Sequence, residues 1–235
     1  MKAGLTLSAF DNRLMSGLEF CRKVYAFSEQ IRKSPGGVNR LRIRGRSEKK
    51  LIEELMPIAR YVQARYSAGR LLRVRWTLGS QQYDARLLSS GFLAEKDVVP
   101  KCQHVEVTKV VHKHDHLLRS LLATQGHAFS VKGISRGRKS KEIVSRPHVY
   151  DNREAEDDLS KGILECIASK DAKDYPSGTV LVVQCVPDTL LLHDEWEYVV
   201  QKLREADAQH RFYEIFIFES RYSATLYGKP RQGTR

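Results

Sequence analysis

In the stretch Gln81-Gln82-Tyr83-Asp84-Ala85-Arg86-Leu87-Leu88, polar and apolar residues alternate, and a second alternating stretch follows in His104-Val105-Glu106-Val107-Thr108. Residues two apart share one face of a β-strand. In the first strand we expect Asp84 to share a face with Gln82 and Arg86, while Tyr83, Ala85 and Leu87 face a core. In the second we expect Glu106 and Thr108 on one face, opposite Val105 and Val107. If the two strands are neighbours in one sheet, Asp84 and Glu106 lie side by side.

Two neighbouring carboxylates need a positive charge between them. Asp84 and Glu106 would repel each other across a few ångströms, and a hard divalent cation such as Mg²⁺ is the usual solution. Metal-dependent cleavage of phosphodiester bonds is therefore the first chemistry that the pattern predicts. The alternative is that both acids belong to the solvated face of edge strands, where isolated acids are common.

The basic residues are clustered along the chain. The 235 residues carry a net charge of +12, with 41% hydrophobic residues, which is typical of a folded globular protein. Residues 32–75 hold thirteen Lys and Arg against three Glu, and residues 132–146 hold six against one. Such clustering predicts a polyanionic partner, most often nucleic acid, rather than a solubility feature or an anionic-membrane patch. The predicted contacts to nucleic acid are Arg42, Arg44, Arg46, Lys132, Arg136, Arg138, Lys139 and Lys141.

Nothing in the sequence predicts a membrane segment or a secretory signal. No run of about eighteen apolar residues occurs, and residues 1–20 lack the apolar region of a signal peptide. The four cysteines are scattered, without a Cys-x-x-Cys pair. They are expected to be reduced, buried thiols, and the protein is expected to be cytoplasmic.

Helical and strand patterns alternate along the chain. Two nearly continuous apolar runs, residues 179–185 and 213–218, are typical of strands buried on both faces. We therefore expect an α/β fold in which a central mixed β-sheet is flanked by helices. Residues 1–46 are expected to form an N-terminal helical extension with a basic arm, and residues 47–235 the α/β domain. The remaining expected elements are a helix over 5–33, a strand or extended arm over 38–46, a helix over 48–67 broken by Pro57, a hairpin of 71–78 with the Asp84 strand, a short helix within 112–126, a mobile loop or irregular hairpin over 130–148, helices over 153–174 and 193–206, and an edge strand over 222–227.

The order of these elements resembles the PD-(D/E)xK nuclease superfamily, over about residues 48–220. The resemblance lies in a helix, a hairpin whose second strand bears an acid, the strand Val-Glu-Val-Thr, a helix ending in Ser-Lys-Asp-Ala-Lys-Asp-Tyr-Pro, and the strand Val-Leu-Val-Val-Gln. It implies a restriction-endonuclease-like fold in which Asp84 and Glu106 bind Mg²⁺ or Mn²⁺. It also implies that an acid of the first core helix assists them. We take this acid to be Glu53, with Glu54 as the alternative.

One position departs from the family pattern. The family lysine is expected two residues after the Glu, where this chain has Thr108, and the adjacent Lys109 points to the other face by strand parity. A lysine from another element can take its place in this superfamily. Lys161 and Lys170 on the helix of residues 153–174 are the candidates, and we include Lys161 with Asp84, Glu106 and Thr108 among the predicted catalytic residues. Surface lysines on a solvated helix face are the alternative.

Together these features predict a Mg²⁺-dependent nuclease that acts on DNA rather than RNA. Two other functions stay open: a non-catalytic nucleic-acid-binding protein with a degenerate nuclease fold, and an assembly protein of a phage or mobile element. A homodimer or a mobile-element protein partner is also compatible with the sequence. A zinc site is the weaker interpretation of the local group Cys102, His104, His112, His114 and His116, because their spacing matches no zinc finger.

Overall fold

A seven-stranded mixed sheet forms the centre of the computed structural model, which describes residues 4–79, 81–137, 142–149, 151–187, 189–206 and 210–228. Its strand order is β1-β2-β3-β4-β7-β8-β9. The strands are β1 (Leu14–Ser16), β2 (Leu71–Trp76), β3 (Ala85–Ser90), β4 (Cys102–Val110), β7 (Thr179–Cys185), β8 (Glu214–Phe218) and β9 (Ser223–Tyr227). The β4–β7 and β7–β8 pairs are parallel and the other neighbours are antiparallel. The α/β prediction with a mixed central sheet is confirmed.

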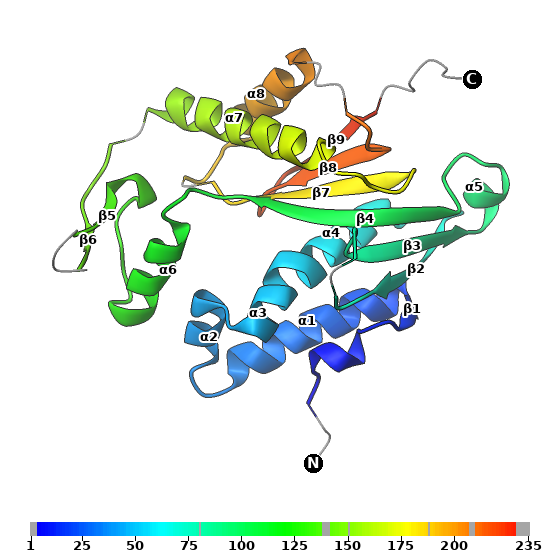
Figure 1. Cartoon of the computed structure of the whole chain (residues 1–235), viewed down its shortest axis with the longest axis horizontal. Coiled ribbons are helices and arrows are strands. Elements are labelled where there is room, and N and C mark those ends of the chain that lie inside the picture. Colours follow the sequence, from blue (N-terminus) through cyan, green and yellow to red (C-terminus); the bar gives the residue numbers. More distant parts are fainter. Residues whose placement is uncertain are drawn as a thin grey trace.

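Helices cover the two faces of the sheet (Figure 1). The main ones are α1 (Gly17–Lys33), α2 (Gly37–Ile43), α3 (Arg46–Lys50), α4 (Met56–Arg65), α5 (Phe92–Glu95), α6 (Asp115–Thr124), α7 (Asn152–Asp171) and α8 (His193–Glu205). α1 and α4 lie on one side, and α7 and α8 on the other. Strand β7 is buried on both faces because Val180 and Val182 contact the α1–α4 layer while Leu181 and Val183 contact the α7–α8 layer.

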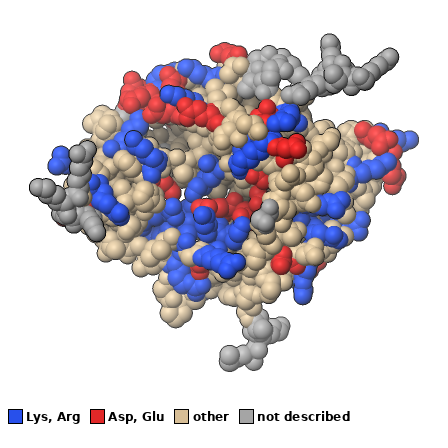
Figure 2. Space-filling model, viewed as in Figure 1, with Lys and Arg blue, Asp and Glu red and all other residues tan. Residues whose placement is uncertain are grey.

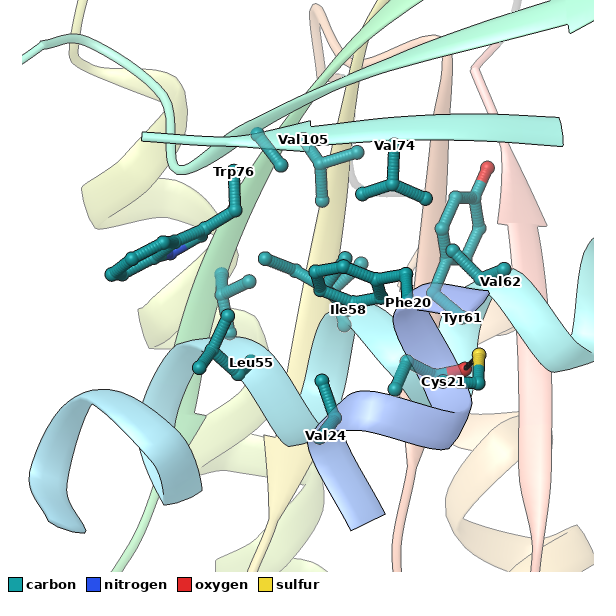
Figure 3. Close-up of a cluster of buried hydrophobic side chains, with 14 of the residues drawn as sticks. Phe20, Cys21, Val24, Leu55, Ile58, Tyr61, Val62, Val74, Trp76 and Val105 are labelled. Atoms are coloured by element: carbon teal, nitrogen blue, oxygen red, sulfur yellow. Dashed lines mark hydrogen bonds between the residues drawn. The ribbon is translucent and has the colours of Figure 1, made fainter. Parts of the chain in front are cut away.

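The larger core lies between the sheet and the α1–α4 layer (Figure 3). Phe20 and Val24 of α1 and Ile58 of α4 point toward Val74 and Trp76 of β2. These side chains are at most 1% exposed. Burial of each large apolar side chain contributes roughly 1.5–3 kcal/mol, so this layer holds the β2–β4 half of the sheet in place.

Pro57 disturbs the helix that was expected over residues 48–67. The chain forms α3, then a π-helical turn η2 (Leu51–Leu55), and then α4 with Pro57 in its first turn. A proline inside a helix has no N–H to donate and its ring clashes with the preceding turn, and a π-turn is one way in which the chain accommodates this. The helical backbone continues from Arg46 to Arg65, and the disturbance expected at Pro57 takes the form of this π-helical turn just before it.

Three local predictions are wrong. The helix expected over residues 5–33 begins only at Gly17, because Leu14–Ser16 form β1 and pair with β2. Residues 38–46 were expected to be a strand or an extended arm, but residues 38–43 belong to α2 and Arg46 begins α3. α2 packs on α1 and α6, and the Arg42 guanidinium donates to the Leu122 carbonyl oxygen. Tyr83, expected in the core, lies outside β3, which begins at Ala85. Its ring contacts that of His104, with a centroid distance of 4.4 Å.

The N-terminal residues belong to the same core as the rest of the chain. Strand β1 pairs with β2, and α1 packs on α4. The boundary drawn at residues 46–47 therefore does not separate two cores, because the apolar face of α1 is buried against the sheet layer that follows.

Beyond the end of β4, a smaller unit contains α6 and the hairpin of β5 (Ile134–Arg136) and β6 (Ile143–Ser145). Leu117, Leu121 and Ile134 form its own small core. The expected irregular hairpin is present here.

Among the described residues, no helix is long and apolar enough to cross a membrane. The four cysteines are free, but Cys102 is exposed and Cys166 only partly buried, so the expectation of four buried thiols is wrong.

Candidate active site

Asp84, the residue before β3, lies close enough to Glu106 of β4 for their negative charges to interact. The antiparallel register of β3 and β4 ends with the pair Ala85 and Val105. The backbone N–H of Asp84 donates to the Val105 carbonyl oxygen at 2.8 Å, and Asp84 Oδ2 accepts from the Val107 N–H at 2.8 Å. The predicted neighbour relation of the two strands, with the helix over 153–174 packed beside them, is confirmed.

The Asp84 carboxyl group lies among negative charges. Within the described residues, no Lys or Arg forms an ion pair with its carboxylate. Burial, followed by the negative charges of Glu54 and Glu106, raises the pKa of Asp84 to about 7, although the Val107 hydrogen bond and the Lys50 ammonium oppose this shift. A bound cation would relieve this repulsion.

Glu106, by contrast, has a cation and a hydroxyl on the same oxygen. Its Oε1 accepts from Lys170 Nζ at 2.5 Å and from the Tyr175 hydroxyl at 3.1 Å. The side chains of Lys170 and Glu106 are only 19% and 12% exposed. Burial and the adjacent Glu106 carboxylate raise the pKa of Tyr175, so this hydroxyl stays protonated and donates.

The phase of α7 decides which lysine reaches the site. Gly162, Cys166 and Lys170, spaced four residues apart, face Val110, Thr108 and Glu106 of β4. Lys161 lies off this stripe, with a side chain that is 76% exposed and 4.0 Å from Glu165. We therefore replace Lys161 by Lys170 among the candidate catalytic residues, because only Lys170 projects toward β4.

The negative charge of Glu54, and not that of Glu53, contributes to the raised pKa of Asp84. Glu53 accepts from Lys109 at 3.1 Å and from Arg44 at 3.0 Å. Although burial raises the pKa of Glu53, these two cations lower it overall, so its charge is already balanced. Glu54 forms an ion pair with Lys50 and accepts from Trp76 Nε1 at 3.1 Å. Glu54, the alternative choice, is thus the acid of the helix layer whose charge raises the pKa of Asp84.

Thr108 shares the face of Glu106, as predicted, but lies under α7. Its hydroxyl is 3.2 Å from Cys166 Sγ. The small Thr side chain fits beneath the helix here, and the ammonium group that contacts Glu106 belongs to Lys170, one turn further along α7. Lys109 points to the opposite face, as strand parity predicted, and contacts Glu53 there.

The predicted nucleic-acid contacts fall into three groups. Arg46 and Arg136 are exposed. Arg42 donates to Leu122, Arg44 pairs with Glu53, and Lys132 pairs with Glu154 and Asp158 at 2.8 and 2.7 Å. Arg138, Lys139 and Lys141 lie outside the described residues. Figure 2 shows acidic side chains near the centre of one face of the molecule with Lys and Arg side chains around them.

The donor set suits Mg²⁺ better than zinc. Among the described residues, no three His, Cys, Asp or Glu side chains are arranged to hold a metal ion by themselves. Mg²⁺ is commonly bound by one or two carboxylates while water and substrate phosphate supply its other ligands. Asp84 and Glu106 provide such a pair of hard oxygen donors, and the raised pKa of Asp84 marks the charge that a cation would balance.

Sequence reasoning missed Lys50 and Trp76, which hold Glu54, and Tyr175, which holds Glu106. The spacing of Gly162, Cys166 and Lys170 is a signal that could have selected Lys170, because it marks one stripe of the helix. No protein-family model, curated protein or solved structure matches this chain.

The raised pKa of Asp84 predicts a pH-dependent cost in stability. Between its ordinary value of 3.8 and about 7, the folded protein keeps a proton that the unfolded chain releases, so stability falls as pH rises through this interval. The whole shift corresponds to about 4 kcal/mol, and we expect about half of it because the carboxyl group is partly exposed. Asp84→Asn, which keeps an acceptor for Val107, should raise Tm by roughly 5 °C near pH 8.

Thermal unfolding of the wild type and of Asp84→Asn from about pH 4 to 8 measures this effect. The difference should vanish near pH 4, where both side chains are neutral. Glu165→Gln, on the exposed face of α7, is the matched control and should show no such trend. A variant that is less stable than the wild type at every pH would contradict the assigned repulsion.

Proposed function

We propose that this protein is a Mg²⁺-dependent nuclease that hydrolyses phosphodiester bonds of DNA, with RNA as the less favoured substrate. The observation that carries the proposal is the pairing of Asp84 with Glu106 beside a lysine, Lys170, that contacts Glu106 from another element. Two carboxylates and an ammonium group are what metal-assisted attack on a phosphodiester needs, since the metal and the cation share the charge of the transition state.

Each residue has a separate role in this proposal. Asp84 and Glu106 would hold Mg²⁺, which on binding makes water a better nucleophile and neutralises charge on the scissile phosphate. The Val107 N–H orients the Asp84 carboxylate, and the Tyr175 hydroxyl orients that of Glu106. Lys170 has three N–H donors, of which one is used by Glu106. The others can orient the attacking water or contact a phosphate oxygen.

The direct test is cleavage by the purified wild-type protein. Plasmid DNA, single-stranded DNA and RNA are incubated with Mg²⁺, with Mn²⁺ and with EDTA, and the products are separated by electrophoresis. We expect cleavage of DNA with Mg²⁺ or Mn²⁺ and none with EDTA. Cleavage that persists in EDTA, or the lack of cleavage under every metal condition, would contradict the proposal.

A second function is favoured by one observation. Lys170 and Tyr175 already satisfy Glu106 Oε1 without a metal, which also suits a protein that binds nucleic acid and has no catalytic activity. Binding of nucleic acid without cleavage, together with no change in Tm on addition of Mg²⁺, would support this alternative.

A further inference from the structure

One half of the sheet is open on the side of Glu106. In Figure 1, α7 and α8 lie over β4, β7 and β8, and their apolar residues pack there. On β2, the residues that face α1 and α4 are at most 1% exposed, whereas Leu71 on the opposite face is 55% exposed and Arg73 is also exposed. Among the described residues, the outer face of β2 and β3 is thus left without a covering helix.

Arginines line this open face. Arg75 of β2 pairs in register with Arg86 of β3, and Arg86 with His104 of β4. Arg73 lies two residues from Arg75 on the same face. We name Arg73, Arg75, Arg86 and His104 the arginine face. Burial and the nearby Arg86 guanidinium lower the pKa of His104, so the positive charge of this face at neutral pH comes from its arginines.

The arrangement costs stability in the free protein. Like charges directly opposite each other on neighbouring strands are unfavourable. Within the described chain, none of the three arginines has a carboxylate within 4.0 Å, although many other Lys and Arg side chains of this protein do. The Nε atoms of Arg75 and Arg86 are buried without a hydrogen-bond partner. One Nη2–H of Arg86 donates to Cys102 Sγ at 3.4 Å. A bound anion would supply the missing negative charge and accept from the guanidinium N–H groups that remain accessible.

The arginine face leads directly to the candidate active site. Asp84 precedes β3 by one residue and Arg86 by two, and its carboxylate accepts from the Val107 N–H of β4, while Glu106 lies two residues from His104 on the same strand. Two residues along a strand span about 7 Å. A phosphate held by Arg75 and Arg86 would therefore lie close to a phosphate at Asp84 and Glu106. The Tyr83 ring, packed on His104, provides an aromatic surface between them.

We infer that the arginine face binds the phosphate backbone of the nucleic-acid strand that enters the candidate active site, with Arg75 and Arg86 as its principal contacts. This inference rests on the proposed nuclease function and adds to it the path of the substrate. The contacts to phosphate carry little sequence information.

The test compares binding by three double variants in EDTA, where no cleavage occurs. Arg75→Gln/Arg86→Gln removes the proposed contacts. Arg75→Lys/Arg86→Lys keeps the charge. Arg22→Gln/Arg204→Gln is the matched control, because it removes two exposed arginines from helices α1 and α8. A labelled oligo-dT strand and a labelled duplex of equal length are titrated with each protein by fluorescence anisotropy over a series of NaCl concentrations.

We expect the Arg75→Gln/Arg86→Gln protein to bind at least about tenfold more weakly than the control at low salt. The slope of log K against log salt should fall by about 1.4 for the single strand or about 1.8 for the duplex, since each lost phosphate contact removes about 0.7 or 0.9. The lysine variant should retain most of the affinity. Neither double variant should have a lower Tm than the wild type. The glutamine variant removes a repulsive pair of charges, and the lysine variant keeps it.

Each other outcome overturns a defined claim. If the wild type binds nucleic acid and the glutamine variant loses no more affinity than the control, the inference fails while the proposed function stands. If the wild type binds neither probe at low salt, both fail. If polyglutamate binds as tightly as nucleic acid and through the same arginines, the face is a general polyanion-binding surface and the inference is wrong.

Discussion

Replacement of Glu106 by Gln is expected to lower Mg²⁺-dependent cleavage by at least about 10³-fold. Gln can still accept from Lys170 and Tyr175, the two groups that now contact Glu106 Oε1. The fold around the site should therefore persist while the negative charge that holds the metal is lost. Cleavage rates at saturating substrate, with the Tm of each protein as a check of folding, measure the effect.

Glu165→Gln is the matched control for this experiment. It removes the same charge from α7, at a side chain that is 68% exposed and contacts Lys161 rather than Glu106. Its activity should equal that of the wild type. If Glu106→Gln folds and cleaves as fast as this control, Glu106 has no part in the chemistry and the proposed function is wrong.

Lys170→Met should lower the cleavage rate by about 10²–10³-fold, whereas Lys161→Met should leave it unchanged. Lys170 is buried against Glu106, while Lys161 extends into solvent from the preceding part of the same helix. Without the ammonium group, the negative charge of Glu106 is no longer partly neutralised. The affinity of the site for Mg²⁺ should therefore stay the same or increase. A fall in turnover without a loss of metal affinity would separate a role in the reaction from a merely structural ion pair.

Metal titrations at several fixed substrate concentrations provide both quantities for the two lysine variants. If Lys170→Met keeps the wild-type rate at saturating Mg²⁺, the ammonium serves only to neutralise Glu106. If Lys161→Met loses activity to the same degree as Lys170→Met, the assignment made from the phase of α7 is incorrect.

Strand alternation was sufficient to predict the central part of the site. Period-two patterning placed Glu106 and Thr108 on one face of β4, and the pairing of β3 with β4 brings Asp84, the residue before β3, to the Val107 N–H. Alternation has this power because side chains of a strand point to opposite faces whatever the rest of the fold does. Tyr83 shows its limit: the pattern ran on into the residues before β3, where the chain no longer follows the strand.

Helical positions were harder to assign. Glu53 and Glu54 are adjacent in sequence, yet one pairs with Lys109 and Arg44 while the other acts on Asp84. Lys170 follows Lys161 by nine positions, and only Lys170 contacts Glu106 of β4. In both cases the answer depends on how a helix is rotated about its axis when it packs on the sheet, and the amphipathic pattern constrains that rotation only coarsely.

By itself, the sequence determined the α/β class, the buried strands β7 and β8, a disturbed helix near Pro57 and the shared face of Glu106 and Thr108. These features follow from local periodicity and from proline geometry, which act over a few residues. Only the tertiary structure decided that Lys170 and Tyr175 contact Glu106, that Glu54 acts on Asp84, and that Arg75 and Arg86 lie together on an open face. Those contacts join residues far apart in the chain, and their formation depends on which strands become neighbours and where the covering helices end.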